Sequence, residues 1–132
     1  MFTDTELAYL RSQHLGRIAT QKPDGTLQNS PVGFRYNAAE GTIDIGGFHL
    51  EDSRKYRNVA ANGRVAFVVD DLVSVQPWRV RCVEIRGRAE VLPTHGTRPA
   101  LIRIHPERII SFGIEEPDTE AHSLSVNARD VR

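Results

Sequence analysis

Residues 83–91 read VEIRGRAEV, and this stretch decides the fold class. Apolar or small residues occupy every odd position, and a charged residue occupies every even one. A period of two is typical of a β-strand with one face against a core and the other in water or at an interface. We therefore expect a strand here.

Short apolar runs separated by turn residues extend the β pattern along the chain. In the hairpin arm predicted over 27–36, Pro31 indicates an edge strand or a bulge, because proline cannot donate to a ladder. The other expected strands lie at 17–21, 42–45, 64–69 (apolar on both faces, hence central), 101–104 and 109–112. Residues 3–6, TDTE, have the spacing of a capping box and predict a short helix that runs to about His14. Together with this helix and a second one over residues 51–63, these strands predict a mainly β barrel or sandwich forming a single domain over 1–132.

The composition limits the kinds of function. Seventeen basic and 17 acidic residues balance, so no overall charge favours nucleic acid or an anionic membrane as a partner. No apolar run approaches the roughly 18 residues that span a membrane, and the start lacks a signal-peptide pattern. The single cysteine, Cys82, fits a reducing compartment, so we expect a cytoplasmic protein. From about residue 115 the tail is polar and is expected to be partly disordered or docked on a partner subunit.

Residues 51–63, EDSRKYRNVAANG, predict a short helix with an unusual charge distribution. Ser53 or the aspartate before it can cap the start, and Gly63 stands where a left-handed residue ends a helix. The first turns carry three cations, Arg54, Lys55 and Arg57.

Cations at an exposed helix start cost about 0.3–1 kcal/mol each, because the macrodipole favours anions there. A bound anion would compensate, since free amides, a cap hydroxyl and cations together form a phosphate seat. The alternative is a solvated basic helix end balanced by Glu51 and Asp52. Both interpretations stay open at this point.

Two further features suit a flat cofactor with a phosphorylated tail. Gly46 and Gly47 end a strand, where paired glycines form a tight exit or let another group approach the backbone. Trp78 and Arg79 follow a loop proline, where tryptophan is either a packing plug or a ring contact. No metal-ligand spacing and no catalytic dyad is present, so catalytic residues stay unassigned; hydride chemistry in a cofactor needs mainly positioning.

Several motifs between residues 5 and 113 resemble the pyridoxamine 5′-phosphate oxidase-like split β-barrels. They are GRIAT at 16–20, DG at 24–25, PV at 31–32 and SRKxxN at 53–58. The resemblance implies that Ser53, Arg54 and Lys55 hold the phosphate of flavin mononucleotide, with Asn58 in the same motif. It also implies that the strand from Ser30 to Phe34, which contains Pro31 and Val32, runs beside the isoalloxazine, and that the strand end from Ile45 to Phe48 packs nearby.

Residues 74–79, SVQPWR, and 102–109, IRIHPERI, are similar to an actinobacterial subgroup assigned to the deazaflavin coenzyme F-420. Members of that subgroup are homodimers with two sites at the subunit interface. The resemblance therefore implies that Trp78 and Arg79 face a cofactor held mainly by the partner chain. Two departures stand out: Phe112 replaces a usual tryptophan, and residues 115–132 lack the substrate-binding residues of true pyridoxamine phosphate oxidases. Vitamin B6 oxidation is not predicted.

The leading hypothesis is a homodimeric oxidoreductase that reduces a small conjugated substrate with reduced coenzyme F-420. A second keeps the fold and site but uses flavin mononucleotide, since both cofactors place a phosphate near a tricyclic ring. Cations for the longer anionic tail of the deazaflavin would be Arg57, Arg64 and Arg79. A third hypothesis is a non-catalytic protein that binds flavin, deazaflavin or haem. The sequence does not identify the acceptor.

Overall fold

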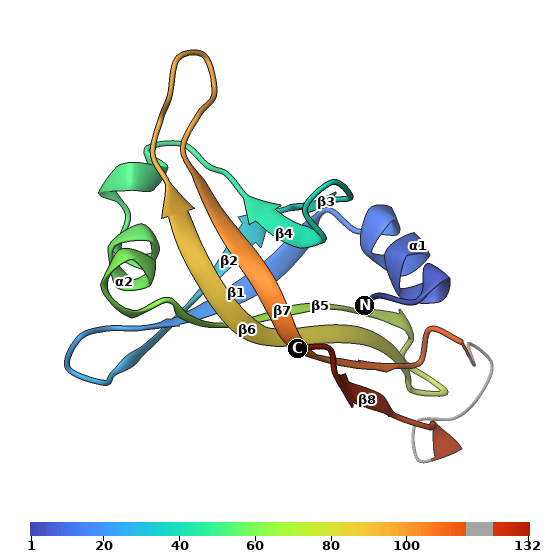
Figure 1. Ribbon diagram of the computed structural model, residues 1–132. Helices are drawn as coiled ribbons and strands as arrows, with labels where there is room; N and C mark the ends of the chain where they lie inside the picture. Colours follow the sequence, from blue (N-terminus) through green and yellow to red (C-terminus); the bar gives the residue numbers. More distant parts are fainter. Residues whose placement is uncertain (116–122) are drawn as a thin grey trace.

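The computed structural model describes residues 1–115 and 123–132 as one curled antiparallel sheet flanked by helices. The elements are α1 (Asp4–Ser12), β1 (Leu15–Gln21), β2 (Leu27–Gly33), β3 (Arg35–Asn37), β4 (Thr42–Ile45), the 3-10 turn η1 (Leu50–Asp52), α2 (Arg54–Asn62), β5 (Arg64–Ser74), β6 (Arg79–Leu92), β7 (Leu101–Phe112) and β8 (Asn127–Asp130). The strand order is β2-β1-β5-β6-β7-β4-β3, and β8 adds to β7. The fold is a mainly β split barrel, as predicted, with α1 and α2 at opposite ends of the sheet (Figure 1).

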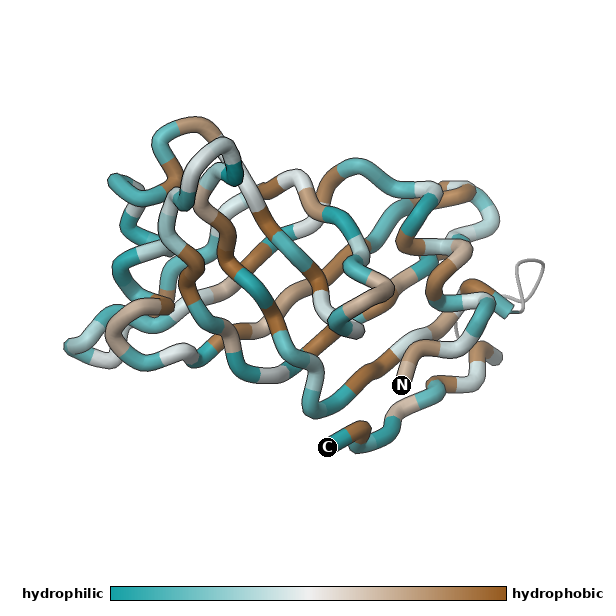
Figure 2. Tube along the Cα trace, turned by 45° about the horizontal axis from the view of Figure 1, so that its top comes forward, coloured by the Kyte–Doolittle hydropathy of each residue, from teal (hydrophilic) through white to brown (hydrophobic). Residues whose placement is uncertain are grey.

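Alternating burial places the core on one face of the sheet. In β6, Val83 and Ile85 are fully buried whereas Arg86 and Arg88 are exposed, which confirms the period of two read from residues 83–91. Figure 2 shows hydrophobic and hydrophilic segments alternating along the strands in the same way. Burying each aliphatic side chain stabilises the fold by about 1.5–3 kcal/mol. The core, and not the polar rim, therefore holds the sheet together.

The strand predicted at 64–69 is longer and less covered than expected. β5 runs to Ser74 between β1 and β6, so its central position is confirmed. Its burial alternates, however, and Ala66 and Val68 are only half-buried. One face of β5 lies in the core and the other lies on the outside of the barrel.

The hairpin arm predicted over 27–36 is divided at Phe34. β2 pairs with β1 along its whole length, whereas β3 pairs with β4. Phe34 packs edge-on against Phe67, with the ring centroids 5.3 Å apart, and this packing anchors the point of division. β2 has β1 as its single neighbour in the described sheet, so Pro31 lies on an edge strand, as predicted.

Residues 101–112 form one strand, β7, and not the two short strands predicted on either side of Pro106. The ladder with β6 shifts register at Gly87, and Pro106 lies opposite this glycine. A Cβ on Gly87 would stand 2.1 Å from the His105 carbonyl oxygen. The bulge accommodates the proline, which would otherwise interrupt the strand.

Both predicted helices are present with their caps. Thr3 and Glu6 form the reciprocal hydrogen bonds of a capping box at the start of α1. Ser53 caps α2, which ends at Gly63 with a left-handed φ of 68°. Each helix has nine residues, and within the described chain no helix is long and apolar enough to cross a membrane.

The end of the polar tail pairs with its own chain, a contact that the sequence analysis did not predict. β8 pairs with β7 through residues 108–111. Arg129 donates two hydrogen bonds to the Glu6 carboxylate, at 2.6 and 2.9 Å, and Ser111 donates a third at 2.6 Å. Residues 116–122 of the predicted tail lie outside the described residues.

Candidate functional site

The start of α2 has the geometry of an anion seat. The Ser53 Oγ accepts a hydrogen bond from the Tyr56 amide at 3.3 Å and donates one to the Leu50 carbonyl at 2.6 Å. The amides of Arg54 and Lys55 open the helix and have no carbonyl one turn back to accept their hydrogens. Because the Ser53 hydroxyl hydrogen is already used, the donors left for an anion are these amides and the neighbouring cations.

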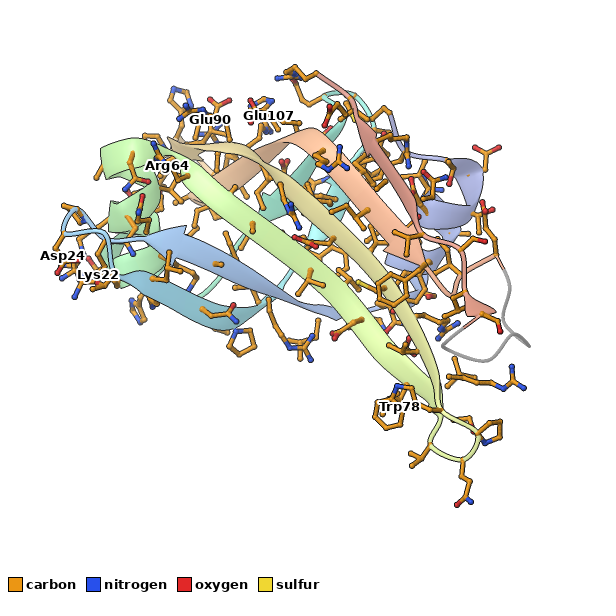
Figure 3. The ribbon with its side chains drawn as sticks, turned by 90° about the horizontal axis from the view of Figure 1, so that it is seen from below. Lys22, Asp24, Arg64, Trp78, Glu90 and Glu107 are labelled. Atoms are coloured by element: carbon orange, nitrogen blue, oxygen red, sulfur yellow. The ribbon has the colours of Figure 1, made fainter. Side chains whose placement is uncertain are left out.

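Three cations gather in the first turn of α2. Arg54 and Arg57 are exposed and Lys55 is half-buried. None of the three makes an ion pair or a side-chain hydrogen bond with a residue that the structure describes. Asp24 lies at the same end of the molecule (Figure 3); its pKa is lowered mainly by hydrogen bonds from the threonine two residues on, and further by Lys22 and Arg54. The first turn of α2 is therefore a cationic surface open to an anion.

Asn58 connects this surface to the interior. It is 1% exposed, and its Nδ2 donates to Thr20 Oγ1 at 3.0 Å and to Gln28 Oε1 at 3.3 Å. The Gln28 Nε2 in turn donates to Ser30 Oγ at 3.4 Å, so a polar chain runs from α2 along β2. The Asn58 Oδ1 is buried and has no partner among the described residues. Such an atom is normally paired by an ordered water or a bound group, because leaving it unpaired costs about 1–3 kcal/mol.

The segments predicted to contact a cofactor ring lie where the barrel splits. The ladder between β3 and β4 ends at the pair Arg35–Asp44. The preceding strand, β2, pairs with β1 instead of β4. Residues 30–33 lie on one side of this division and residues 46–48 on the other; we call these two segments the split edges. Pro31, Gly46 and Gly47 are exposed, Ser30 is half-buried and Val32 is buried.

The structure brings the split edges and α2 together. Four residues separate the second split edge from Ser53, and η1 makes the turn between them. The Gln28–Asn58 hydrogen bond joins the strand of the first split edge to α2. A ligand with an anionic end at α2 can therefore extend toward both edges.

Trp78 and Arg79 lie elsewhere in the same chain. They stand at the end of the β5–β6 hairpin, and Figure 3 shows Trp78 at the far end of the molecule from Lys22 and Asp24. β5 has 11 residues, and at about 3.3 Å per residue it spans roughly 35 Å. Trp78 is 53% exposed. One chain alone does not place these two side chains beside α2.

Two buried groups have raised pKa values. Burial raises the pKa of the Cys82 thiol to about 12, and Asp70 and Glu84 add to this effect. Burial also raises the pKa of Tyr9, whose hydroxyl donates to Asp71 at 2.8 Å. Neither group changes its protonation near neutral pH.

The residues present fit a cofactor that combines a phosphate with a flat ring. Arg54, Lys55 and the two free amides suit the phosphate, and the exposed backbone of the split edges suits the ring. When bound, a flavin or deazaflavin supplies the hydride chemistry. Gly33 and Phe48 lie on the same edges and inside the two ranges that the resemblance places at the ring, but the sequence analysis did not name them as site residues. Gly33 could have been found from the sequence as a third glycine at a strand end, whereas the exposure of Phe48 depends on tertiary structure.

Comparison with known proteins gives a consistent result. Residues 2–131 match the family described as pyridoxamine 5′-phosphate oxidase. A 5a,11a-dehydrotetracycline/5a,11a-dehydrooxytetracycline reductase of Streptomyces rimosus is 47% identical over 136 residues, covering 98% of this chain and 96% of the relative.

Solved structures share the fold. The conserved hypothetical protein Rv2991 from Mycobacterium tuberculosis has a TM-score of 0.71 at 19% identity, covering 95% of this chain and 93% of its own. A structure described as an F-420 reductase has a TM-score of 0.54 at 25% identity, covering 70% and 86%. Because the family match and the reductase each cover almost the whole chain, the protein belongs to the pyridoxamine 5′-phosphate oxidase family and is an oxidoreductase.

Proposed function

We propose that this protein is a homodimeric reductase that uses reduced coenzyme F-420 to reduce a conjugated organic substrate. The observation that carries the proposal is the first turn of α2, where Arg54 and Lys55 have no partner among the described residues. Cations are unfavourable at a helix start, and a bound phosphate reverses that effect. The site therefore suits a cofactor with a phosphate.

Each part of the site has a role in holding such a cofactor. Arg54 and Lys55 bind the phosphate, and Ser53 fixes the helix start through its bonds to Tyr56 and Leu50. The exposed glycines of the second split edge let a flat ring approach the backbone. The chain's contribution is binding, orientation and the exclusion of water, while the bound ring supplies the hydride.

The proposed substrate class follows from the 47% identical relative, which is named for its action on two dehydrotetracyclines. We extend to this chain the class of fused-ring molecules with a conjugated carbon–carbon double bond. In such a molecule the hydride adds to one carbon of the double bond and a proton adds to the other. The double bond becomes a single bond, and the reduced cofactor is oxidised by two electrons.

A second copy of the chain completes the proposed site. Trp78 and Arg79 lie far from α2 in their own chain, so they face the cofactor only if a partner supplies them. The outer face of β1 and β5 offers a surface for pairing, with half-buried Ala19, Ala66 and Val68 beside two shallow hollows of about 290 Å³ each. Sedimentation of the purified protein at micromolar concentration is expected to give a dimer; a monomer would exclude this part of the proposal.

The decisive experiment titrates the purified protein with oxidised coenzyme F-420 and, separately, with flavin mononucleotide, following fluorescence. We expect tight binding of the deazaflavin and a dissociation constant about tenfold higher in Lys55→Ala, because a charge-assisted hydrogen bond contributes about 1.5–3 kcal/mol. Arg132→Ala, at the last residue of the chain and outside α2, serves as the charge-matched control and should bind like the wild type.

Other outcomes redirect the assignment. Tight binding of flavin mononucleotide alone would replace the cofactor and keep the reductase. Binding of neither would reduce the cationic turn of α2 to a solvated helix end. Cofactor binding without oxidation of the reduced form by any conjugated acceptor would make the protein a binder and not an enzyme.

A further inference from the structure

At three glycine positions, neither the backbone φ nor crowding by the described chain requires glycine. Five of the ten glycines adopt a left-handed φ, and two more, Gly16 and Gly87, would place a Cβ 2.4 and 2.1 Å from other atoms. The remaining three are Gly33, Gly46 and Gly47. A Cβ on Gly46 would meet nothing within 4 Å, and on Gly33 or Gly47 it would meet one atom at 4.0 Å.

These three glycines lie on the split edges. Gly33 ends β2, where it pairs with Leu15 of β1, and Gly46 and Gly47 directly follow the end of β4. Glycine loses more conformational freedom on folding than any other residue and weakens extended segments. Bare backbone on both edges, with no crowding by the chain itself, indicates close approach by a group from outside the chain.

Phe48 follows the glycine pair and is 100% exposed, against 53% for Trp78. The next residue, His49, is left-handed at φ 52° and ψ 37°, and its carbonyl accepts a hydrogen bond from the Asp52 amide at 3.0 Å. A non-glycine residue rarely adopts this conformation unless its surroundings impose it. The turn thus holds the phenyl ring of Phe48 in solvent, with both aromatic faces free.

A cavity of about 490 Å³ adjoins this turn. Gly47, His49 and Asp52 line one side of it, and Thr94 and Pro99 of the β6–β7 loop line the other. The Thr94 hydroxyl donates to Glu51 at 2.6 Å and ties the loop to η1. This volume lies within the roughly 300–1,000 Å³ that is usual for small-molecule sites.

We propose that Phe48 and the three bare glycines form the acceptor-binding surface, on which a planar fused-ring acceptor stacks. Stacking on a phenyl face favours flat, multi-ring molecules over single rings, because the contact grows with the overlapping area. Phe48 is thus the specificity-determining residue, and the glycines keep the edges clear so that the acceptor can lie beside the cofactor ring proposed above. The identification of the ligand as a hydride acceptor rests on the proposed function.

Direct binding tests the surface without turnover. The probe is tetracycline, a four-ring molecule with its own fluorescence, titrated into wild type, Phe48→Ala, Phe48→Trp and the control Val126→Ala, whose side chain is also exposed at 59%. We expect Phe48→Ala to raise the probe's dissociation constant at least fivefold, with Phe48→Trp and the control within twofold. Coenzyme F-420 affinity should change less than twofold in all of them. Unchanged probe affinity in Phe48→Ala, no probe binding by the wild type, or an equal loss of cofactor affinity would each overturn the proposal.

The glycines provide a second, independent test. Gly46→Leu should keep the melting temperature within about 2 °C, because space is open there, yet weaken probe binding at least tenfold. Gly33→Ala, a smaller change, should retain the fold and weaken the probe less. Gly87→Ala is the contrast, since its Cβ meets backbone at 2.1 Å and should lower the melting temperature. Folded Gly46→Leu and Gly33→Ala proteins with wild-type probe affinity would refute the role of the bare edges.

Turnover separates this inference from the proposed function. Loss of probe binding in Phe48→Ala, without hydride transfer from any reduced cofactor in the wild type, would leave a planar-ligand site and remove the reductase proposal. If the wild type turns over and Phe48→Ala keeps the same preference for multi-ring over single-ring acceptors, the reductase proposal stands and the role of Phe48 is overturned.

Discussion

Two charged clusters at opposite ends of the sheet use arginine in opposite ways. Beside α1, Arg129 donates two hydrogen bonds to Glu6, which is 0% exposed, and Ser111 and the Thr3 amide donate to the same carboxylate. At the start of α2, Arg54 has no hydrogen-bond or ion-pair partner among the described residues.

The difference separates a structural charge from a ligand-binding one. A buried carboxylate must be paired, because an uncompensated buried charge is strongly destabilising, so the first cluster ties the two ends of the chain together. Exposed cations at a helix start slightly destabilise the folded protein. Mutations in the first cluster should therefore lower the stability of the protein, and mutations at the start of α2 should weaken ligand binding.

The largest expected effect is on the first cluster. Arg129→Met leaves Glu6 buried without its cation and should lower the free energy of unfolding by about 3 kcal/mol. Urea denaturation measures the loss, and cofactor affinity should stay at the wild-type value in the folded variant. Arg108→Ala removes the neighbouring ion pair with Asp130, whose side chains are 38% and 75% exposed, and should cost less than about 1 kcal/mol. Equal losses of unfolding free energy in the two variants would show that the buried pair and the surface pair contribute equally to stability.

A pH titration of stability should also report on the first cluster. Burial alone raises the pKa of Glu6, but the hydrogen bonds from Arg129, Ser111 and Thr3 outweigh it, so the pKa lies below its ordinary value of 4.5. Stability from this group is therefore present above pH 4.5 and is lost as the pH falls through the folded-state pKa. Urea midpoints measured from pH 7 down to 3 should fall in the wild type and fall less steeply in Glu6→Gln.

The slope that remains in Glu6→Gln has an identified source. The pKa of Asp44 is lowered because hydrogen bonds from Arg103, Asn37 and Thr42 outweigh its burial. The pKa of Asp71 is lowered chiefly by its hydrogen bond from Arg81. A Glu6→Gln profile that overlays the wild type would show that the Glu6 carboxylate does not contribute to acid stability.

An intermediate effect is expected at the helix cap. Ser53→Ala removes the acceptor of the Tyr56 amide and should lower stability by about 1 kcal/mol. Because the cap also fixes the position of the free amides, cofactor affinity should fall together with stability. Ser53→Asp restores an acceptor and should recover stability, but its negative charge at the phosphate seat should leave affinity low. Recovery of both properties in Ser53→Asp would exclude an anion at this position.

The smallest effect has the opposite sign. Arg54→Glu replaces an unfavourable charge at the helix start with a favourable one and should stabilise the cofactor-free protein by about 0.5 kcal/mol. The same change should weaken cofactor binding by tenfold or more through charge repulsion. Lys22→Glu, in the nearby turn, is the control for general electrostatic effects. A loss of stability in Arg54→Glu would mean that Arg54 has a structural role.

Local patterns predicted most of the fold and part of the site. The alternation at 83–91, the capping box at Thr3 and the Ser53-to-Gly63 helix needed information from only a few neighbouring residues, and all three are confirmed. Long-range pairing was less predictable. The single strand β7 depends on Gly87 in β6 accommodating Pro106, and no local pattern around the proline contains that glycine.

By itself, the sequence determined the period of each element, the helix ends and the cationic first turn of α2. These features depend on backbone geometry and side-chain chemistry within a few residues. The tertiary structure alone decided which charges are satisfied: Glu6 and Arg129 are 123 positions apart and meet in a hydrogen bond, while Arg54 and Lys55 meet none among the described residues. It also decided where the barrel splits: β2 pairs with β1 and β3 with β4, because strand register, and not sequence distance, sets which backbones lie side by side.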